Sequence, residues 1–177
     1  TIINRHTFIT KVVEGGEVLY AQEPTAEVKN DIRVDKSLMS VRGILEFART
    51  VRLEDVRELL DQQIKLNSAI AEEGLKHCYG AQVGRTLLTV YGDDVKVRAR
   101  AKAAAGSDAR MGGCSLPVVI NSCSGNQGMT VSLPVIEYAK TLGASSEQLY
   151  RALVISNLIS IHQKKYIGSL SAYCGAV

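Results

Sequence analysis

The pattern of apolar and polar positions divides the chain into a short β segment followed by a helical body. Residues 2–22 are rich in β-branched side chains, partly alternate with polar ones, and contain a Gly-Gly pair, which is typical of two strands joined by a tight turn. A polar connector follows, and from Ser40 onward apolar residues recur at helical spacing. The predicted class is α+β: an N-terminal β-hairpin or small β element at 1–22, then a mainly helical body at 40–177, within a single domain.

The strongest helical pattern lies in residues 53–77, with an apolar stripe on one side and charged residues elsewhere. The stripe consists of Val56, Leu59, Leu60, Ile64, Ile70 and Leu75. Further helices are predicted at 40–51, 93–111, 130–142 and 145–168. Ser40 is the expected N-cap of the first, and Ser145 or Ser146 with Gln148 is a capping signal for the last. Residues 78–90 contain two glycines and fit neither a helix nor a strand clearly.

Composition narrows the class of protein. The chain has 177 residues, 46% of them hydrophobic and 22% charged, which is typical of a globular domain. Its net charge of +3 is small and spread out, so nucleic acid is not an expected partner. No apolar run approaches the roughly 18 residues of a membrane helix, and the start has no signal-peptide pattern. We therefore expect no membrane partner and a cytoplasmic location.

The four cysteines show no C-x-x-C pair and no zinc-finger spacing. They are Cys78, Cys114, Cys123 and Cys174. This spacing favours reduced thiols over disulfides. Cys114 and Cys174 each stand beside glycine, where a buried apolar cysteine is the simplest expectation.

A Gly-rich segment, SCSGNQGMT, precedes the predicted helix at 130–142. A helix N-terminus has unpaired N–H groups and the positive end of the dipole, so it can hold a carboxylate or phosphate. The candidate ligands here are Ser122, Ser124, Gly125, Asn126, Gln127 and Gly128. The segment is neither a Walker A loop nor a dinucleotide fingerprint. An ordinary capping turn explains the pattern equally well.

Two further polar positions have alternative explanations. Arg110 follows Asp108 among small residues, so it either pairs locally with Asp108 or uses its guanidinium to bind a carboxylate. His6 lies in the first predicted strand; it is either structural or the catalytic group that moves a proton near pH 7. His77 and His162 lie on predicted helices beside lysines and are expected to be solvated.

Four segments together resemble one family. They are HTFITKVVEGGEVLY, LNSAIAEEGL, AAAGSDARMGGCSLPVVINSCSGNQGMTVSLPVIEYA and EQLYRALVISNLISIHQKKYIGSLSAYCGA. In this order they resemble segments of L-cysteine desulfidases, which are related to the α chains of iron–sulfur L-serine dehydratases. The pair SDARMGG and SGNQG is the most specific part, and the resemblance covers nearly the whole chain.

The resemblance implies β-elimination of sulfide from L-cysteine, or of water from L-serine, to give pyruvate and ammonia. It implies a [4Fe–4S] cluster held by three cysteines, with Cys174 as one ligand. The small amino-acid substrate would be the partner, and a homodimer is a further expectation. The segment SCSGNQGM would hold the substrate carboxylate.

Members of that family are longer, and the other two ligand cysteines would lie before and after this segment. We therefore expect a part of a longer catalytic chain, without a cluster and inactive by itself. The alternative is a non-catalytic domain that binds a small anion or serves as an assembly surface.

Overall fold

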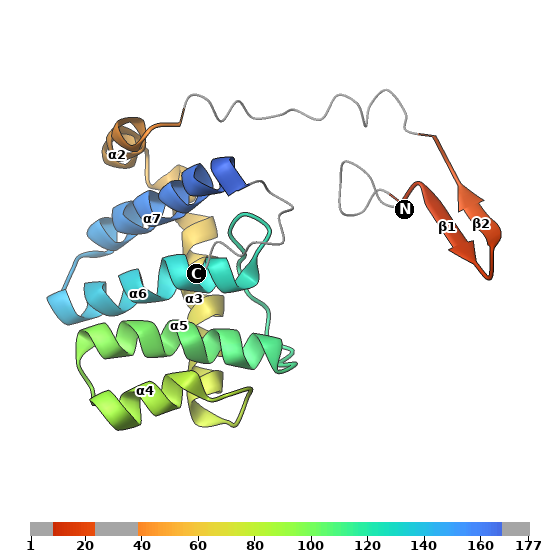
Figure 1. The fold of residues 1–177 in the computed structure, drawn as a ribbon. Coiled ribbons are helices and arrows are strands. Elements are labelled where there is room, and N and C mark those ends of the chain that lie inside the picture. Colours follow the sequence, from red (N-terminus) through yellow and green to blue (C-terminus); the bar gives the residue numbers. More distant parts are fainter. Residues whose placement is uncertain (1–8, 24–38, 168–177) are drawn as a thin grey trace. The chain divides into compact units, whose positions relative to one another are not determined.

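A computed structural model of the chain describes residues 9–23 and 39–167 (Figure 1). The chain divides into two compact units, Thr1–Asp35 and Lys36–Val177. The first unit contains a two-stranded sheet and the second contains the helices. The predicted α+β class, with a small β element before a helical body, is confirmed.

The sheet is an antiparallel hairpin of β1 (Lys11–Glu14) and β2 (Glu17–Ala21). The two glycines between the strands have φ of 57° and 90°, values that residues with a side chain rarely adopt. The Gly-Gly pair therefore makes the tight turn, as its sequence predicts.

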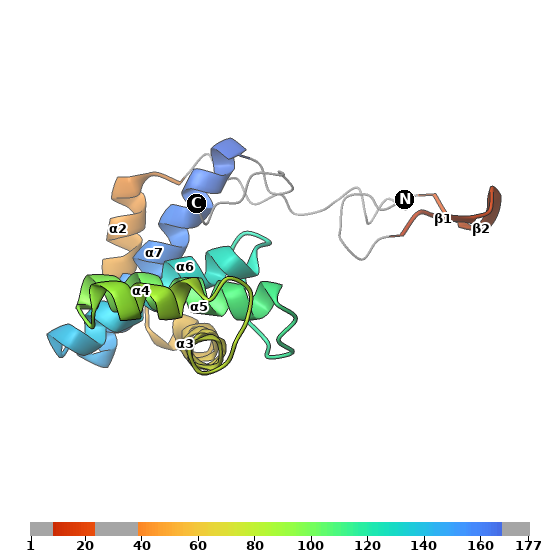
Figure 2. The same ribbon diagram turned by 60° about the horizontal axis from the view of Figure 1, so that its bottom comes forward.

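Six helices form the described part of the second unit. They are α2 (Val41–Thr50), α3 (Glu54–Lys76), α4 (Val83–Tyr91), α5 (Val95–Met111), α6 (Gly125–Leu142) and α7 (Ser146–Ile167). Helices α4 to α7 lie in a row, α3 runs across this row against α5 and α6, and α2 packs on α7 (Figures 1 and 2). The arrangement places the start of α6 beside the end of α5.

Local capping fixes where several helices begin. The Ser40 side chain accepts a hydrogen bond from the backbone N–H of Gly43, and the Asp94 carboxylate accepts one from Lys96. Ser145 and Gln148 form a reciprocal capping box, at 2.8 and 3.2 Å. The capping roles predicted for Ser40 and for Ser145 with Gln148 are confirmed.

Small residues let α3, α4 and α5 approach closely. A Cβ at Gly74 of α3 would lie 2.1 Å from the carbonyl oxygen of Ala105, and one at Gly84 of α4 would lie 2.3 Å from that of Ala101. Large apolar side chains fill the adjoining core, including Ile70, Met129, Leu133, Ile136 and Leu153. The alanine and glycine residues of α5 thus serve close helix packing.

A partly buried ionic cluster connects three helices. The Glu137 side chain on α6 is 6% exposed, and its carboxylate lies 2.7 Å from the Lys102 ammonium of α5. Lys102 also contacts Glu72 of α3 at 2.8 Å. Burial alone would raise the pKa of Glu137, but the hydrogen bond and charge of Lys102, with Lys140, hold it below its ordinary value.

The structure corrects the predicted apolar stripe of α3. Leu59 is 61% exposed, whereas the polar residues Gln63 and Asn67 are buried. Hydrophobicity alone misplaces these positions because buried amides are stable where hydrogen bonds satisfy them.

The predicted start of the fourth helix, Thr130, is also wrong. Helix α6 begins at Gly125, so most of the predicted loop is its first turn. The glycines there permit close packing rather than a flexible loop. None of the helices in the described ranges is both long and apolar enough to span a membrane.

Candidate functional site

A strained two-residue turn precedes α6. Asn121 and Ser124 exchange two backbone hydrogen bonds of 3.0 Å, and the residues between them, Ser122 and Cys123, have φ of 46° and 66°. Positive φ at both central positions is typical of a type I′ turn, where Asn-Gly is favoured. Residues with side chains cost about 1–3 kcal/mol each in this conformation. The surrounding contacts must therefore hold the turn.

The first turn of α6 has two backbone donors without a hydrogen bond to another described residue. Ser124 is the N-cap: its hydroxyl oxygen accepts from the Gln127 N–H at 3.2 Å, and its carbonyl accepts from Gly128. The two donors are the N–H groups of Gly125 and Asn126. Those two groups lie at the positive end of the helix dipole.

Arg110, from the last turn of α5, lies against this helix end. Its Nη1 donates to Asn126 Oδ1 at 3.2 Å. A Cβ at Gly125 would lie 2.4 Å from Arg110 Nε, so a larger residue there would displace the exposed guanidinium from its present position. Gly125 does not have a positive φ. Glycine at this position thus allows the close approach of Arg110.

Asp108 does not pair with Arg110, so the local-pair alternative is wrong. Its carboxylate instead accepts from the backbone N–H of Val83 at 2.7 Å, at the start of α4. The two side chains leave α5 in different directions, and the exposed guanidinium of Arg110 stays with α6.

Gln127 holds the turn from inside. Its side chain is buried, and its Nε2 donates to Asn121 Oδ1 at 3.2 Å and to the hydroxyl of Ser160 on α7. Asn121 in turn donates to Asn157 of α7 at 2.9 Å, and Asn157 donates to Gln63 of α3 at 2.8 Å. A chain of amides thus links the turn to two helices.

Asn67 of α3 holds the segment before the turn, and the sequence analysis missed it. It accepts from Val119 N–H at 2.9 Å and donates to the carbonyls of Val119 and Gly128 at 3.2 Å. Gly128 permits this packing, since a Cβ there would lie 2.1 Å from the Val119 carbonyl oxygen. The sequence did contain a signal for this role: Asn67 lies at helical spacing within the apolar stripe, where a polar residue needs hydrogen-bond partners.

The predicted ligands Ser122, Ser124, Gly125, Asn126, Gln127 and Gly128 thus lie in one turn and helix start, with Arg110 beside them. A role in binding substrate stays a prediction for each. His6 and Cys174, the catalytic and metal candidates, lie outside the described residues.

Of the remaining candidate side chains, only Cys123 belongs to this turn. Cys78 and Cys123 are exposed free thiols, and Cys114 is half-buried rather than fully buried. His77 is solvated, as predicted, and lies 3.7 Å from Glu73. His162 is not fully solvated: its ring packs edge-on against Tyr166, and its Nδ1 is buried without a partner among the described residues.

A separate cluster surrounds Tyr79. Its hydroxyl donates to the Glu73 carboxylate at 3.0 Å. This hydrogen bond, with burial and the neighbouring Cys114, raises the pKa of Tyr79 to about 12. The tyrosine is therefore a hydrogen-bond donor at neutral pH and carries no charge.

The described residues do not fit an iron–sulfur cluster. Within residues 9–23 and 39–167, no three His, Cys, Asp or Glu side chains lie close enough together to hold a metal ion. Cluster binding normally requires several cysteine thiolates at one place. The expected absence of a cluster from this chain by itself stays a prediction.

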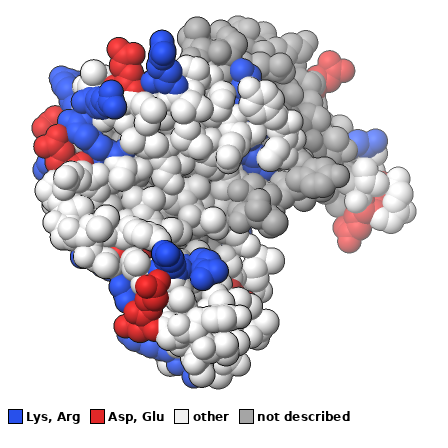
Figure 3. Space-filling view, turned by 60° about the vertical axis from the view of Figure 1, so that its left-hand side comes forward, with Lys and Arg blue, Asp and Glu red and all other residues white. Residues whose placement is uncertain are grey.

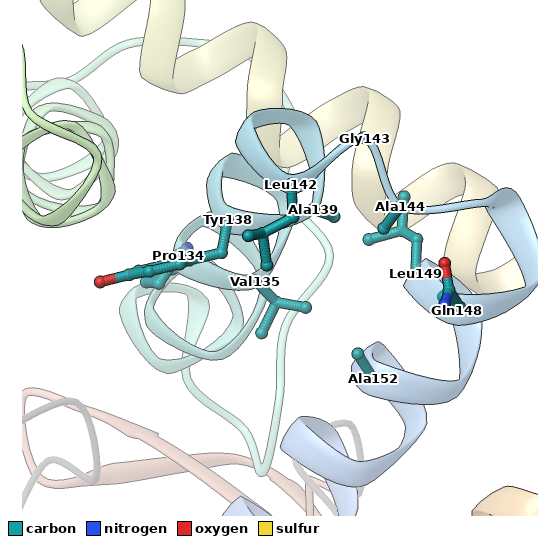
Figure 4. A pocket seen from close by; sticks show the side chains of 10 residues that line it. All are labelled: Pro134, Val135, Tyr138, Ala139, Leu142, Gly143, Ala144, Gln148, Leu149 and Ala152. Carbon is teal, nitrogen blue, oxygen red and sulfur yellow. The ribbon is translucent and has the colours of Figure 1, made fainter.

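A hollow lies at the other end of α6. It has a volume of about 740 Å³ between α6 and α7, where Val135 and Ala152 face each other across it (Figure 4). Its ten described lining residues include no charged side chain. The hollow therefore lacks a cation to hold a carboxylate. Elsewhere, the face drawn in Figure 3 shows broad uncharged areas between groups of charged residues.

Comparison with known proteins decides the family. Residues 11–177 match the serine dehydratase alpha chain family. The chain belongs to this family. The strained turn, α6 and Arg110 all lie within the matched part of this serine dehydratase alpha chain segment.

Relatives in several bacteria are longer than the chain. It is 57% identical over 176 residues to a UPF0597 protein of Lachnoclostridium phytofermentans, covering 99% of the chain and 42% of the relative. It is 57% identical over 178 residues to one of Desulfitobacterium hafniense, covering 99% and 41%. One from Fusobacterium nucleatum is 44% identical over 181 residues, with 99% and 42% covered. The chain spans about two-fifths of their length. No solved structure matched the chain.

Proposed function

We propose that this chain supplies the substrate-carboxylate site of a lyase that acts on L-serine or L-cysteine. Membership of the serine dehydratase alpha chain family supports the reaction class. The observation that carries the proposal is the 3.2 Å contact between Arg110 Nη1 and Asn126 Oδ1, at the N-terminus of α6. It brings a cation and two backbone donors to one place.

The physical basis is charge-assisted hydrogen bonding. A carboxylate at this helix end would accept from the N–H groups of Gly125 and Asn126 and from the guanidinium of Arg110. Asp108, the nearest acid in the sequence, is engaged by Val83 N–H and does not neutralise Arg110. Anion binding is therefore favoured over cation binding.

The proposed reaction removes the Cα proton and breaks the Cβ–O bond of serine or the Cβ–S bond of cysteine. Water or sulfide leaves, and the aminoacrylate takes up water to give pyruvate and ammonia. His6 is our candidate for the group that accepts the proton. The family supports serine, and the segment resemblance to L-cysteine desulfidases supports cysteine.

In this proposal the [4Fe–4S] cluster belongs to a longer protein, with Cys174 as one ligand. A suitable test protein is a chimaera in which this chain replaces the matching stretch of the L. phytofermentans relative. Cys174→Ser is expected to lower its iron and acid-labile sulfide content, because iron–sulfur sites prefer thiolate donors. Cys78→Ser, at an exposed thiol, is the control. Equal cluster content in both variants would contradict the assignment.

The carboxylate site is tested in the same chimaera with Arg110→Ala. Losing a hydrogen bond to a charged group costs about 1.5–3 kcal/mol, which corresponds to a roughly ten- to hundred-fold higher KM. Arg100→Ala on the same helix is the control, because Arg100 is exposed and its Nε bonds only to the carbonyl of Lys96 among the described contacts. Pyruvate formation from each amino acid gives the kinetics and identifies the preferred substrate.

Two outcomes would change this conclusion. Equal kinetics in the Arg110 and Arg100 variants would remove the carboxylate site. An Arg110-dependent affinity for L-serine, without pyruvate formation by an iron-loaded chimaera, would favour the non-catalytic anion-binding alternative.

A further inference from the structure

The N-terminal hairpin carries several exposed apolar side chains on both strands. Every residue of β1 and β2 is exposed. Its large side chains include Val12, Val13, Val18, Leu19 and Tyr20, which are 40–57% exposed. Surface clusters of this kind, beyond single scattered residues, mark interaction sites.

Each face of the hairpin carries one pair of apolar residues. Val12 pairs with Tyr20, and Val13 pairs with Val18. Because neighbouring residues of a strand point to opposite faces, these two pairs lie on opposite sides of the ribbon. A two-stranded sheet in water is at best marginally stable and normally needs further strands or a covering layer. This hairpin has apolar surface for a layer on either face.

The hairpin is an integral part of the family. The match to the serine dehydratase alpha chain family begins at Lys11, the first residue of β1. The L. phytofermentans relative is aligned over 99% of the chain, yet more than half of its own length lies outside the aligned stretch. The longer relatives therefore contain polypeptide that could cover the hairpin.

We propose that the hairpin is a docking element for the polypeptide that longer family members carry beyond the stretch matched here. The partner chemistry is a β-strand that hydrogen-bonds along the outer edge of β2, with apolar side chains over the faces. Such docking within one chain has a high effective concentration, which favours it over pairing between two copies. This inference is independent of the proposed lyase activity.

Hydrogen exchange of the backbone amides tests the proposal. Amides of residues 12–20 are expected to exchange at least tenfold more slowly in the intact L. phytofermentans relative, at its aligned positions, than in this chain alone. Equal exchange rates in the two proteins would overturn the proposal. The proposal would also be overturned if amide exchange in this chain alone became slower as the protein concentration was raised, since a second copy would then be the partner.

Substitution in the chimaera provides a second measurement. Leu19→Lys, on β2, is expected to restore fast exchange in the hairpin and to lower the thermal midpoint. Val90→Lys on α4, at a similarly exposed valine, is the control and is expected to leave hairpin exchange unchanged. If the Leu19 variant does not fold, the exchange comparison of the unmodified proteins still decides the question. Unchanged exchange in a folded Leu19 variant would contradict docking through this strand.

Discussion

Replacing Gly128 with alanine tests the contact that fixes the segment before α6. The added Cβ would lie 2.1 Å from the Val119 carbonyl oxygen, 3.0 Å from Ile120 Cα and 3.1 Å from Asn121 N. All three neighbours are backbone atoms, so no side chain can rotate away to make room. The segment must therefore move off the helix.

The expected cost follows from these contacts. Overpacking of this kind typically costs about 1–3 kcal/mol. Moving Val119 also weakens its bonds with Asn67, at about 1 kcal/mol each. Because alanine has a higher helix propensity than glycine, the substitution also stabilises the helix by up to about 1 kcal/mol. We expect a net loss of about 3 kcal/mol in the free energy of unfolding.

Urea unfolding followed by circular dichroism measures the loss. An unchanged slope of the free energy of unfolding against urea concentration shows that the two proteins have comparable unfolded states. Gly43→Ala is the matched control: it is also in the first turn of a helix, and its Cβ would meet only the Ser40 hydroxyl, at 3.3 Å. A loss below about 1 kcal/mol for Gly128→Ala would refute the argument that close backbone packing requires this glycine.

Two further substitutions test strain and charge. Cys123→Gly is expected to raise the free energy of unfolding by about 1 kcal/mol, because glycine adopts φ of 66° without penalty; a destabilised variant in the same urea assay would contradict this. Glu137 has a lowered pKa, so its ion pair with Lys102 stabilises the fold above the unfolded value of about 4.3 and is lost as pH falls through the lower folded value. Glu137→Gln should therefore reduce the loss of stability that occurs as pH falls below about 4.3. An unchanged dependence of stability on pH would refute it.

Local signals predicted the elements of the fold well. The Gly-Gly pair, the N-cap Ser40 and the apolar period of 53–77 each depend on residues near one another in sequence, and the structure confirms the turn, the cap and helix α3. Helix α4 stayed ambiguous because its cap is tertiary: Asp108, 25 positions away, binds the Val83 N–H. No local pattern can reveal such a cap.

The candidate site shows the same limit more strongly. The glycines at 125 and 128 indicated a loop, yet both lie in helix α6. Glycine occurs there because Arg110 and Val119, from other parts of the chain, lie close to the helix. The importance of Asn67 also depends on distant partners. Local pattern located the segment, whereas tertiary contacts determined where α6 begins and which residues hold it.

The amides behind the turn have a consequence for enzymology. Asn121, Gln127 and Asn157, with Gln63 and Asn67 beside them, carry no ionisable group. Their hydrogen bonds neither gain nor lose a proton across the range in which enzymes are assayed. A pH–rate profile of a protein containing this turn would therefore report the titration of substrate or of other side chains, and not that of the residues that hold the proposed carboxylate site.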